Sequence, residues 1–417
     1  MKLPPGWASV KLQQIGQCIS GLTYSPDDVV DNPNDGLLVL RSSNIQSGEL
    51  SFNDNVFVRA MITDNSLTRE GDILVCVRNG SRGLIGKSAL ISGRGVGVAH
   101  GAFMMLFRAK DFAFAYQLFQ SREYFRQVHE NLGATINSIN SSDFYRFRFQ
   151  FPPEAERSAI AELLSTWDAA IEQTDQLIAA KQRRNDVLSN RLLFGHVRFG
   201  KRNTKTTRSL HWFSAPSDWQ VVEIGKIARE VSALNGSDDG LPVLSCTKYD
   251  GLVDSLEYFD KQVFSHDTSK YKVVGRGQFA YATNHIEEGS IGYQDFVDAG
   301  LVSPIYTVFQ SDSKKIDDGY FYKLLKTEKL RQIFSARTNS SVDRRGSLRW
   351  KDFARIHIPL PPLDEQREIN AVLDDAKREV VLLQTEVKAL KQQKRGLMQK
   401  LLTGQWRVPV TNSEVVT

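Results

Sequence analysis

The feature that most constrains the fold of this chain is an internal duplication. At an offset of 209 residues, residues 143–198 align with residues 352–407 without a gap. Fourteen of the 56 aligned positions are identical, whereas average composition would give about three. Two convergent helices would explain the shared leucines. They would not explain DFxR, PP and Gly-x-x-Arg in one ungapped frame, so a pseudo-twofold internal repeat is predicted.

A shorter match opens each half of the chain, where residues 3–15 resemble residues 215–227. The segments between the matches, 16–142 and 228–351, show no resemblance to each other. We therefore predict a variable domain, a repeated helical region, a second variable domain and a second helical region. The expected boundaries are 1–151 and 152–200, a linker at 201–212, then 213–360, 361–408 and a tail at 409–417.

Both repeated regions have the pattern of a long helix that begins after a proline pair, Pro152-Pro153 or Pro361-Pro362. Apolar residues recur every seven positions in the same register, which is typical of a coiled coil. A helix of about 40 residues would be about 60 Å long and needs a partner. Because a whole domain connects the two copies, we predict an antiparallel pair. The expected packing residues are Ile160, Leu164, Trp167, Ile171, Ile369, Leu373, Val380, Leu383, Val387 and Leu390, with Leu373, Val380 and Leu383 facing Leu164, Ile171 or their neighbours.

Three polar residues, Lys181, Asn185 and Lys394, interrupt this apolar pattern. A polar residue in a coiled-coil seam fixes the register of the helices, and a lysine there can extend its ammonium group into water. Alternatively, the interruption marks an opening for the helices of another subunit. The sequence leaves both interpretations open.

The two variable domains show the same order of predicted elements. Apolar runs typical of strands lie between turns that contain Gly, Asn and Ser, at residues 37–45, 71–80, 88–92, 241–249, 275–283 and 303–310. One amphipathic helix follows in each domain, at 114–132 and 319–336. The expected fold class is therefore α+β: two globular domains of mixed α/β structure, separated by two long helices that form an antiparallel coiled coil.

Basic and amide side chains gather in the predicted loops of both domains. Residues 335–355 hold six basic residues against two acidic ones. Arginine reads guanine in the major groove, asparagine reads adenine, and lysine and arginine hold phosphates. Each residue alone is more often a solvated loop side chain, so the prediction applies to the group. The DNA-binding candidates are Arg41, Asn44, Arg78, Asn79, Ser81, Arg82, Asn137, Asn140, Lys248, Asn284, His285, Arg337, Asn339, Arg344 and Arg345.

The catalytic and cofactor motifs that we sought are not supported. Residues 80–88, GSRGLIGKS, resemble a phosphate-binding loop but place five residues between the glycines where that motif has four. The seven histidines are scattered without ligand spacing. We therefore expect no catalytic residue, no metal site and no cofactor. His285 stays a candidate base or phosphate contact, although an ordinary loop histidine is the favoured interpretation.

The composition excludes several classes of protein. No run of 18 apolar residues occurs, so no membrane span is expected, and the first residues lack the apolar segment of a secretory signal. The three cysteines lie far apart without a CxxC pair, which argues against a disulfide framework and favours a cytoplasmic protein. The net charge, 53 − 48 = +5, permits nucleic-acid binding without establishing it.

The whole arrangement resembles the specificity subunit of type I restriction–modification enzymes. The resemblance covers essentially the whole chain and rests on Trp7 and Trp219, on the segments 144–153 and 353–362, and on the helix ends LLFG and LLTG. It implies that each variable domain is a target-recognition domain for one half of an asymmetric double-stranded DNA sequence. It also implies a coiled-coil spacer that docks the modification (methyltransferase) subunits, and a restriction and motor subunit as a further partner.

The resemblance implies no enzymatic activity for this chain, because in that family the S-adenosylmethionine and ATP chemistry belongs to the partner subunits. One departure is the weaker apolar seam of the first helix, which leaves open whether both helices bind partners equally. Two alternatives remain. One is the specificity subunit of a related system with a fused methyltransferase–nuclease. The other is a coiled-coil scaffold that does not bind DNA, and salt-dependent duplex binding would separate it from the DNA-reading proteins.

Overall fold

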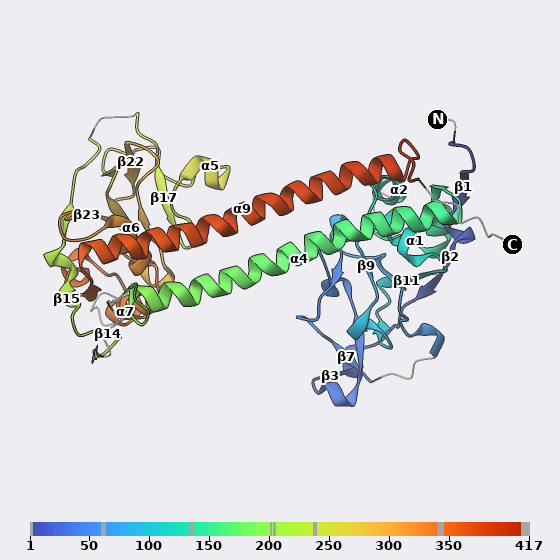
Figure 1. Ribbon diagram of the computed structural model, residues 1–417, viewed down its shortest axis with the longest axis horizontal. Helices are drawn as coiled ribbons and strands as arrows, with labels where there is room; N and C mark the ends of the chain where they lie inside the picture. The colour runs from blue at the N-terminus through green and yellow to red at the C-terminus, as the bar shows by residue number, and fades with distance from the viewer. Residues whose placement is uncertain are drawn as a thin grey trace. The chain divides into compact units, whose positions relative to one another are not determined.

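The computed structural model describes residues 3–59, 64–132, 137–200, 202, 206–236, 240–339 and 346–409. The chain divides into two compact units. Unit 1 comprises Met1–Gln176 and Gln384–Thr417, and unit 2 comprises Leu177–Leu383. Each unit combines one α/β domain with parts of two long helices, α4 (Glu154–Leu193) and α9 (Leu363–Leu401), which are continuous ribbons in Figure 1.

The α/β domain of unit 1 contains two four-stranded sheets. The first has the strand order β2-β11-β8-β9, with bounds Gly16–Ser20, Met104–Ala109, Ile73–Cys76 and Ser88–Leu90. The second has the order β10-β4-β7-β3, with bounds Ala99–His100, Leu37–Leu40, Phe57–Val58 and Val29–Val30. Two further pairs are β1 (Ala8–Lys11) with β12 (Arg148–Phe151), and β5 (Ile45–Gln46) with β6 (Glu49–Leu50).

Unit 2 repeats the first of these four-stranded sheets and the pair of β1 with β12, but it has no second four-stranded sheet among its described residues. Its four-stranded sheet has the order β16-β23-β20-β21, with bounds Ala228–Val231, Tyr306–Ser311, Phe279–Ala282 and Ile291–Tyr293. The two-stranded sheets are β15 (Gln220–Glu223) with β24 (His357–Leu360), β17 (Leu244–Thr247) with β18 (Gly251–Asp254), β19 (Lys272–Gly275) with β22 (Ala299–Val302), and β13 (Thr207–Ser209) with β14 (Ser214–Pro216). The shared strand order confirms the pseudo-twofold repeat.

The prediction of a single helix in each domain is wrong, because the structure has two helices in each of the predicted ranges. Unit 1 has α1 (Phe112–Phe119) and α2 (Arg122–Asn131), and unit 2 has α6 (Asp318–Leu325) and α7 (Glu328–Asn339). A hydroxyl side chain caps the second helix in each case, since Ser121 accepts from the Tyr124 N–H and Thr327 from the Leu330 N–H. The short helices α3 (Ser141–Tyr145), α5 (Ser255–Phe259) and α8 (Trp350–Phe353) complete the domains.

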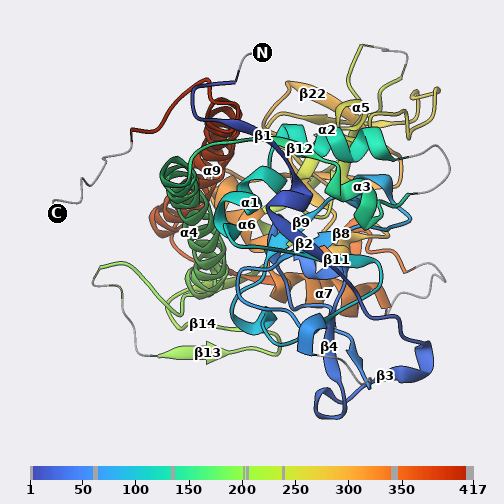
Figure 2. The ribbon, with the colours of Figure 1, turned by 90° about the vertical axis from the view of Figure 1, so that its right-hand side faces the viewer.

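The two long helices pack antiparallel within each unit, which confirms the predicted coiled coil (Figures 1 and 2). In unit 1, Leu164 near the start of α4 shares a hydrophobic core with Met398 and Leu401 near the end of α9. In unit 2, Leu192 near the end of α4 shares a core with Leu373 near the start of α9. The expected facing of Leu373 with Leu164 is therefore wrong, because the antiparallel direction places the start of each helix against the end of the other.

The heptad positions nevertheless lie on the inner faces of the helices. Each of the predicted packing residues is buried or half-buried: Ile160, Leu164, Trp167, Ile171, Ile369, Leu373, Val380, Leu383, Val387 and Leu390. The polar seam residues are paired with the opposite helix. Lys181 contacts Glu379, and the Asn185 amide donates to the Ala376 carbonyl at 2.8 Å in unit 2, while Lys394 contacts Asp168 in unit 1. These pairs favour the interpretation that the polar residues fix the helix register.

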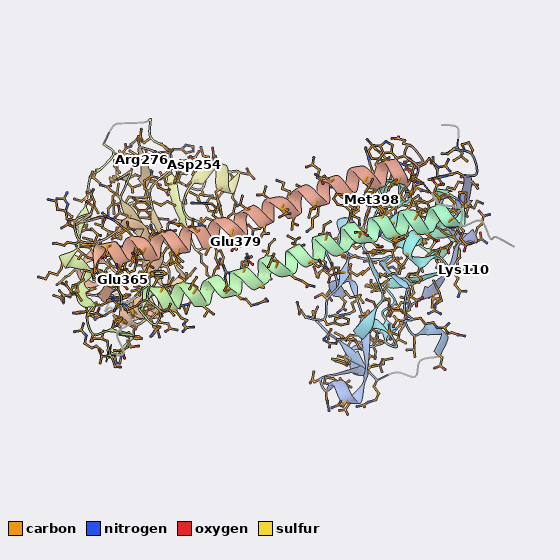
Figure 3. All side chains as sticks on the ribbon, in the orientation of Figure 1. Lys110, Asp254, Arg276, Glu365, Glu379 and Met398 are labelled. Atoms are coloured by element: carbon orange, nitrogen blue, oxygen red, sulfur yellow. The ribbon has the colours of Figure 1, made fainter. Side chains whose placement is uncertain are left out.

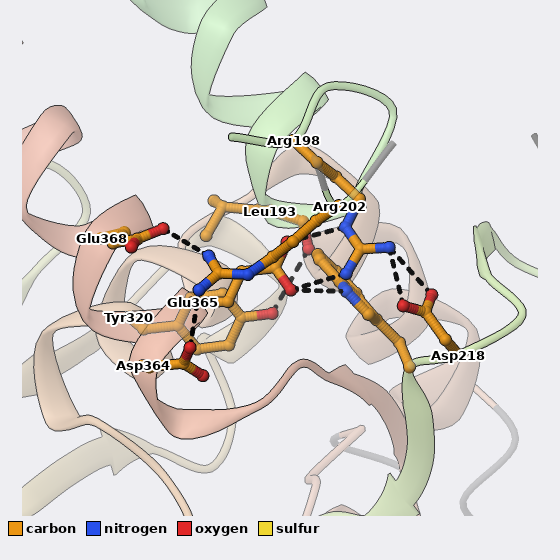
Figure 4. Close-up of polar contacts among 9 residues, drawn as sticks. Leu193, Arg198, Arg202, Asp218, Tyr320, Asp364, Glu365 and Glu368 are labelled. Atoms are coloured by element: carbon orange, nitrogen blue, oxygen red, sulfur yellow. Dashed lines mark hydrogen bonds and ion pairs between the residues drawn. The ribbon is translucent and has the colours of Figure 1, made fainter. Parts of the chain in front are cut away.

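A buried carboxylate joins the start of each long helix to its domain. In unit 2, Glu365 accepts hydrogen bonds from Arg198 and from the Trp219 indole (Figure 4). Figure 3 places Glu365 near one end of α9 and Met398 near the other. In unit 1, the equivalent Glu156 accepts from Arg407 Nε at 2.6 Å and from Trp7 Nε1 at 3.0 Å. Each arginine follows the end of one long helix and each carboxylate stands at the start of the other, so we call these clusters the helix-junction clamps.

The clamp of unit 1 predicts an acid-sensitive contribution to stability. Burial favours the neutral form of Glu156, but the hydrogen bonds from Arg407 and Trp7 outweigh it and lower the pKa of this carboxyl group. Because the pKa of Glu156 is lower in the folded than in the unfolded chain, the ionised carboxylate stabilises the fold at pH values above the unfolded pKa of about 4.3. This stabilisation is lost as the pH falls through the folded pKa. We expect Glu156→Gln to lower the Tm most near pH 7 and progressively less below about pH 4. Thermal melts at several pH values would measure this.

The exposed Glu154 lies in the same helical turn and supplies the control, since Glu154→Gln should change the Tm little at any of these pH values. A Glu156→Gln deficit that stays constant from pH 7 to pH 3 would contradict the assignment.

Candidate nucleic-acid interface

Several connections of unit 1 meet at one end of its sheets. Strands β4 and β10 are parallel, so they end on the same side. Strand β11 begins at the same end, because only residues 101–103 separate it from β10. Strand β8 also ends there, since its last residue Cys76 pairs with Met104, the first residue of β11. The Ile139 N–H donates to the Val77 carbonyl, which brings in the segment before α3. We call this surface loop surface 1 and define it as residues 21–24, 41–44, 77–81, 101–103 and 137–140.

Hydrogen bonds hold the segments of loop surface 1 together. The Asn79 amide donates to Ser42 Oγ at 3.1 Å, and the Arg78 N–H donates to the Phe103 carbonyl at 3.1 Å. The Arg78 guanidinium lies 5.7 Å from the centre of the Phe103 ring. Arg41 forms an ion pair with Asp54 at 3.0 Å beside a cavity of about 540 Å³ that Phe103 also lines. Basic, amide and aromatic groups from distant parts of the sequence therefore share one surface.

The structure corrects one candidate of this domain. Asn44 is fully buried, and its amide donates to the carbonyl oxygens of Ser51 at 2.9 Å and Asp54 at 3.2 Å. Its side-chain oxygen accepts from the Arg41 N–H at 2.8 Å. The side chain therefore shapes the loop that presents Arg41, and it is not available to an outside ligand.

The other candidates of unit 1 lie at or near the surface. Arg78, Ser81, Arg82 and Asn140 are exposed, whereas Arg41, Asn79 and Asn137 are half-buried. Two of these side chains also have structural roles. Asn140 caps α3 by accepting from the Asp143 N–H, and Arg82 lies 3.3 Å from the Leu132 carbonyl.

Unit 2 brings the equivalent connections together. The Leu348 N–H donates to the Thr283 carbonyl, and Thr283 Oγ1 donates to the Ile305 carbonyl at 3.0 Å. The Lys326 ammonium group donates to the carbonyls of Lys248 at 2.7 Å and Gly289 at 2.8 Å, which ties two loops to α6. Loop surface 2 comprises residues 232–235, 248–250, 283–288, 303–305 and 346–349.

Three of the DNA-binding candidates of unit 2, Lys248, Asn284 and His285, belong to loop surface 2, and the others do not. Lys248 is exposed beside the ring of Tyr249, with 5.2 Å between the ammonium nitrogen and the ring centre. Asn284 and His285 lie in the loop that follows β20, where His285 contacts Glu288 at 3.3 Å. Arg337 is exposed in α7, and Asn339 is the last residue of that helix. Arg344 and Arg345 lie outside the described residues.

The described residues include one histidine–carboxylate group with metal-like spacing. The ligand atoms of His285, Glu287 and Glu288 lie within 4.8 Å of one another. Two of these three side chains are exposed, and exposed acidic groups commonly adopt such spacing without an ion. This geometry therefore gives no reason to assign a metal there.

A family model described as the type I restriction modification DNA specificity domain matches the chain twice, over residues 4–181 and 216–392. The chain belongs to this family. Both matches run from a variable domain into a long helix, so the family unit coincides with the internal repeat. This specificity protein is accordingly a DNA-recognition subunit and not an enzyme, in agreement with the prediction. Within the described part of the chain, no helix is long and apolar enough to span a membrane.

Two curated relatives match this chain over nearly its whole length, and a third matches less than half of it. The StySPI specificity subunit of a type I restriction enzyme from Salmonella potsdam is 25% identical in a gapped alignment 444 positions long, which covers 97% of this chain and 91% of that protein. The putative MjaX specificity subunit of a type I restriction enzyme from Methanocaldococcus jannaschii is 24% identical in a gapped alignment 433 positions long, which covers 98% of this chain and 95% of that protein. The EcoKI specificity subunit from Escherichia coli is 30% identical over 179 residues, 42% of this chain and 38% of that protein.

Solved structures show the same fold. A chain from work on the complex assembly and conformational transition of the type I R-M system aligns with a TM-score of 0.57 at 18% identity, over 97% of this chain and 100% of that chain. The S subunit of a type I restriction–modification system from M. genitalium aligns with a TM-score of 0.53 at 16% identity, over 96% and 98% of the two chains.

Proposed function

We propose that this specificity subunit reads an asymmetric, bipartite sequence in double-stranded DNA in the cytoplasm, with one half-site per loop surface. The observation that carries the proposal is the pair of loop surfaces, which occupy equivalent ends of two matching sheets. The shared framework presents different side chains: Arg41, Arg78 and Asn79 on one surface, and Lys248, Asn284 and His285 on the other. Two different surfaces on one framework suit two different half-sites.

The chemistry of loop surface 1 supports base reading. Arginine can donate two hydrogen bonds to a guanine edge and asparagine can pair with an adenine edge in the major groove. Arg78 is exposed, and both its backbone N–H and its guanidinium group contact Phe103, so its position is partly fixed before DNA arrives. The Ser42 hydroxyl restrains the Asn79 amide in the same way. Such preorganisation reduces the entropy lost when a side chain binds.

We also propose that the two long helices fix the spacing between the half-sites and dock the partner subunits. Each helix contributes to both units without a break, so a bound duplex would be read at one spacing and helical phase. Leu177, Val187 and Leu382 are exposed apolar residues of these helices. They are candidates for contact with the modification subunits, and a restriction and motor subunit would complete the assembly.

A related system with a fused methyltransferase–nuclease partner remains the second candidate, because it would use the same two loop surfaces. Sequencing the methylated sites in cells that express this chain with its modification subunit would identify the target, and purifying the assembled complex would identify the type of partner. A coiled-coil scaffold without DNA binding would give no salt-dependent affinity for a duplex.

We expect Arg78→Ala to weaken binding of the assembled methyltransferase to its target duplex by about 1–3 kcal/mol, if Arg78 reads a base. In that case discrimination at one base pair should also be lost. If Arg78 holds a phosphate, affinity should fall for all sequences, and the salt slope should drop by about one. Fluorescence anisotropy at several salt concentrations measures both quantities.

Arg94→Ala is a matched control for this experiment. Arg94 is also exposed, with its guanidinium 4.9 Å from the Phe52 ring centre. It belongs to the β9–β10 connection, which hydrogen-bonds to residues 68–72 at the start of β8, away from loop surface 1. If Arg78→Ala and Arg94→Ala have equal effects, loop surface 1 is not where unit 1 reads DNA.

A further inference from the structure

An exposed apolar side chain occupies the same position on both loop surfaces. Phe103 immediately precedes β11 and Ile305 immediately precedes β23, the equivalent strands of the two sheets. The exposed fraction is 56% for Phe103 and 53% for Ile305. Neither residue stands out in the sequence, because a single apolar residue before a strand is unremarkable there.

Both residues are fixed to the loops that carry the polar candidates. The Phe103 carbonyl accepts from the Val77 N–H at 3.0 Å and from the Arg78 N–H at 3.1 Å. The Ile305 carbonyl accepts from Thr283 Oγ1 at 3.0 Å, next to Asn284. Each apolar side chain is therefore held beside donors and acceptors suited to base edges.

We propose that Phe103 and Ile305 each contact the 5-methyl group of a thymine in the major groove, one in each half-site. This inference rests on the proposed function. Among the features of base-pair edges in the major groove, the thymine methyl group is the apolar one. The Arg78 guanidinium lies 5.7 Å from the Phe103 ring, and Arg41 and Ser42 line one cavity with Phe103. An apolar group beside such polar neighbours matches a methyl group better than a polar base edge.

The polar side chains beside Phe103 also argue against insertion between bases. Wedge residues enter the minor groove and unstack a base step. The neighbours of Phe103, namely Arg41, Arg78 and Asn79, are residue types that read the major groove. A methyl contact requires only that an apolar surface reach the groove edge, which both a phenyl ring and an isoleucine side chain can provide.

The test uses the full chain assembled with its modification subunits and the target found by methylation-site sequencing. Uracil replaces thymine at each A·T pair in turn, which removes only the methyl group. For the wild-type assembly, one such replacement in each half-site should weaken binding about fourfold, the effect of one buried methyl group. In Phe103→Ala the penalty should vanish in one half-site only, and in Ile305→Ala in the other half-site only.

Two control variants remove exposed apolar side chains from the opposite ends of the same sheets. Val96 lies in the β9–β10 connection and Phe296 in the β21–β22 connection, and both are exposed. Val96→Ala and Phe296→Ala should keep both uracil penalties. Phe103→Leu keeps an apolar group and should keep part of its penalty, which separates the contact from a folding defect in Phe103→Ala.

The outcomes separate this inference from the function on which it rests. If the wild-type assembly binds its target no better than an unrelated duplex, the proposed function fails. If binding is specific but no uracil replacement weakens it, or the penalties persist unchanged in Phe103→Ala and Ile305→Ala, the methyl contacts are wrong and the proposed function stands.

Discussion

Replacing Glu365 with alanine should destabilise unit 2 by about 3 kcal/mol, a large fraction of the stability of a typical domain. Glu365 is fully buried and accepts from Arg198 Nε at 2.7 Å, Arg198 Nη2 at 2.8 Å and Trp219 Nε1 at 3.1 Å. The Arg198 side chain is only 3% exposed. Removal of the carboxylate would therefore leave a buried cation and an indole N–H without their acceptor.

The expected loss lies at the lower end of the range for broken buried ion pairs, about 3–5 kcal/mol. The reason is Asp218, which also accepts from Arg198 at 2.9 Å and would continue to neutralise it. Chemical denaturation followed by circular dichroism would measure the change in the free energy of unfolding.

Glu368→Ala is the control on the same helix. Glu368 pairs with Arg202, but its side chain is 49% exposed, and solvent screening leaves such surface pairs with little effect on stability. Equal losses for Glu365→Ala and Glu368→Ala would mean that the helix-junction clamp acts as an ordinary surface pair.

The residues of the helix-junction clamps could be recognised in the sequence, but their pairing could not. Glu156 and Glu365 are aligned and identical in the duplication, and so are Arg198 and Arg407. Their identity was visible, but their pairing was not, because Arg198 binds the carboxylate of the other copy, 167 residues away. A local pattern such as a heptad predicts which face of a helix is buried. It does not predict which end of another helix lies opposite.

The loop surfaces show a different limit. Residue type alone made Arg41, Asn44, Arg78 and Asn79 candidates for DNA contact. In the structure, all four lie at one end of the sheets of unit 1. The structure also shows that backbone groups occupy the amide of Asn44. An asparagine that holds a loop and one that reads a base look alike in sequence, since both favour turns. Phe103 was missed because its exposure depends on the sheet beneath it.

Exchanging residues 16–142 for the corresponding block of a relative should change one half of the recognised sequence and leave the other half unaltered. The preference for the old half-site should fall by at least about 30-fold, which corresponds to half of the smallest usual free-energy difference between specific and non-specific binding. The reciprocal exchange of residues 228–351 should change the other half. Methylation-site sequencing of cells that carry each hybrid would read both outcomes directly.

The structure adds a condition to this exchange, because the hydrophobic core crosses the boundaries of the block. Phe144 lies outside the block and packs against Phe107, Phe119 and Tyr124 inside it, with ring centres 5.4–6.2 Å apart. The Cys18 N–H also donates to the Tyr145 hydroxyl across the junction. A donor block with large apolar residues at these three positions should fold on the recipient framework, whereas one with small residues would leave a cavity at the cost of several kcal/mol. If a hybrid with a matched core melts like the parent yet alters both half-sites, the two loop surfaces do not read DNA independently.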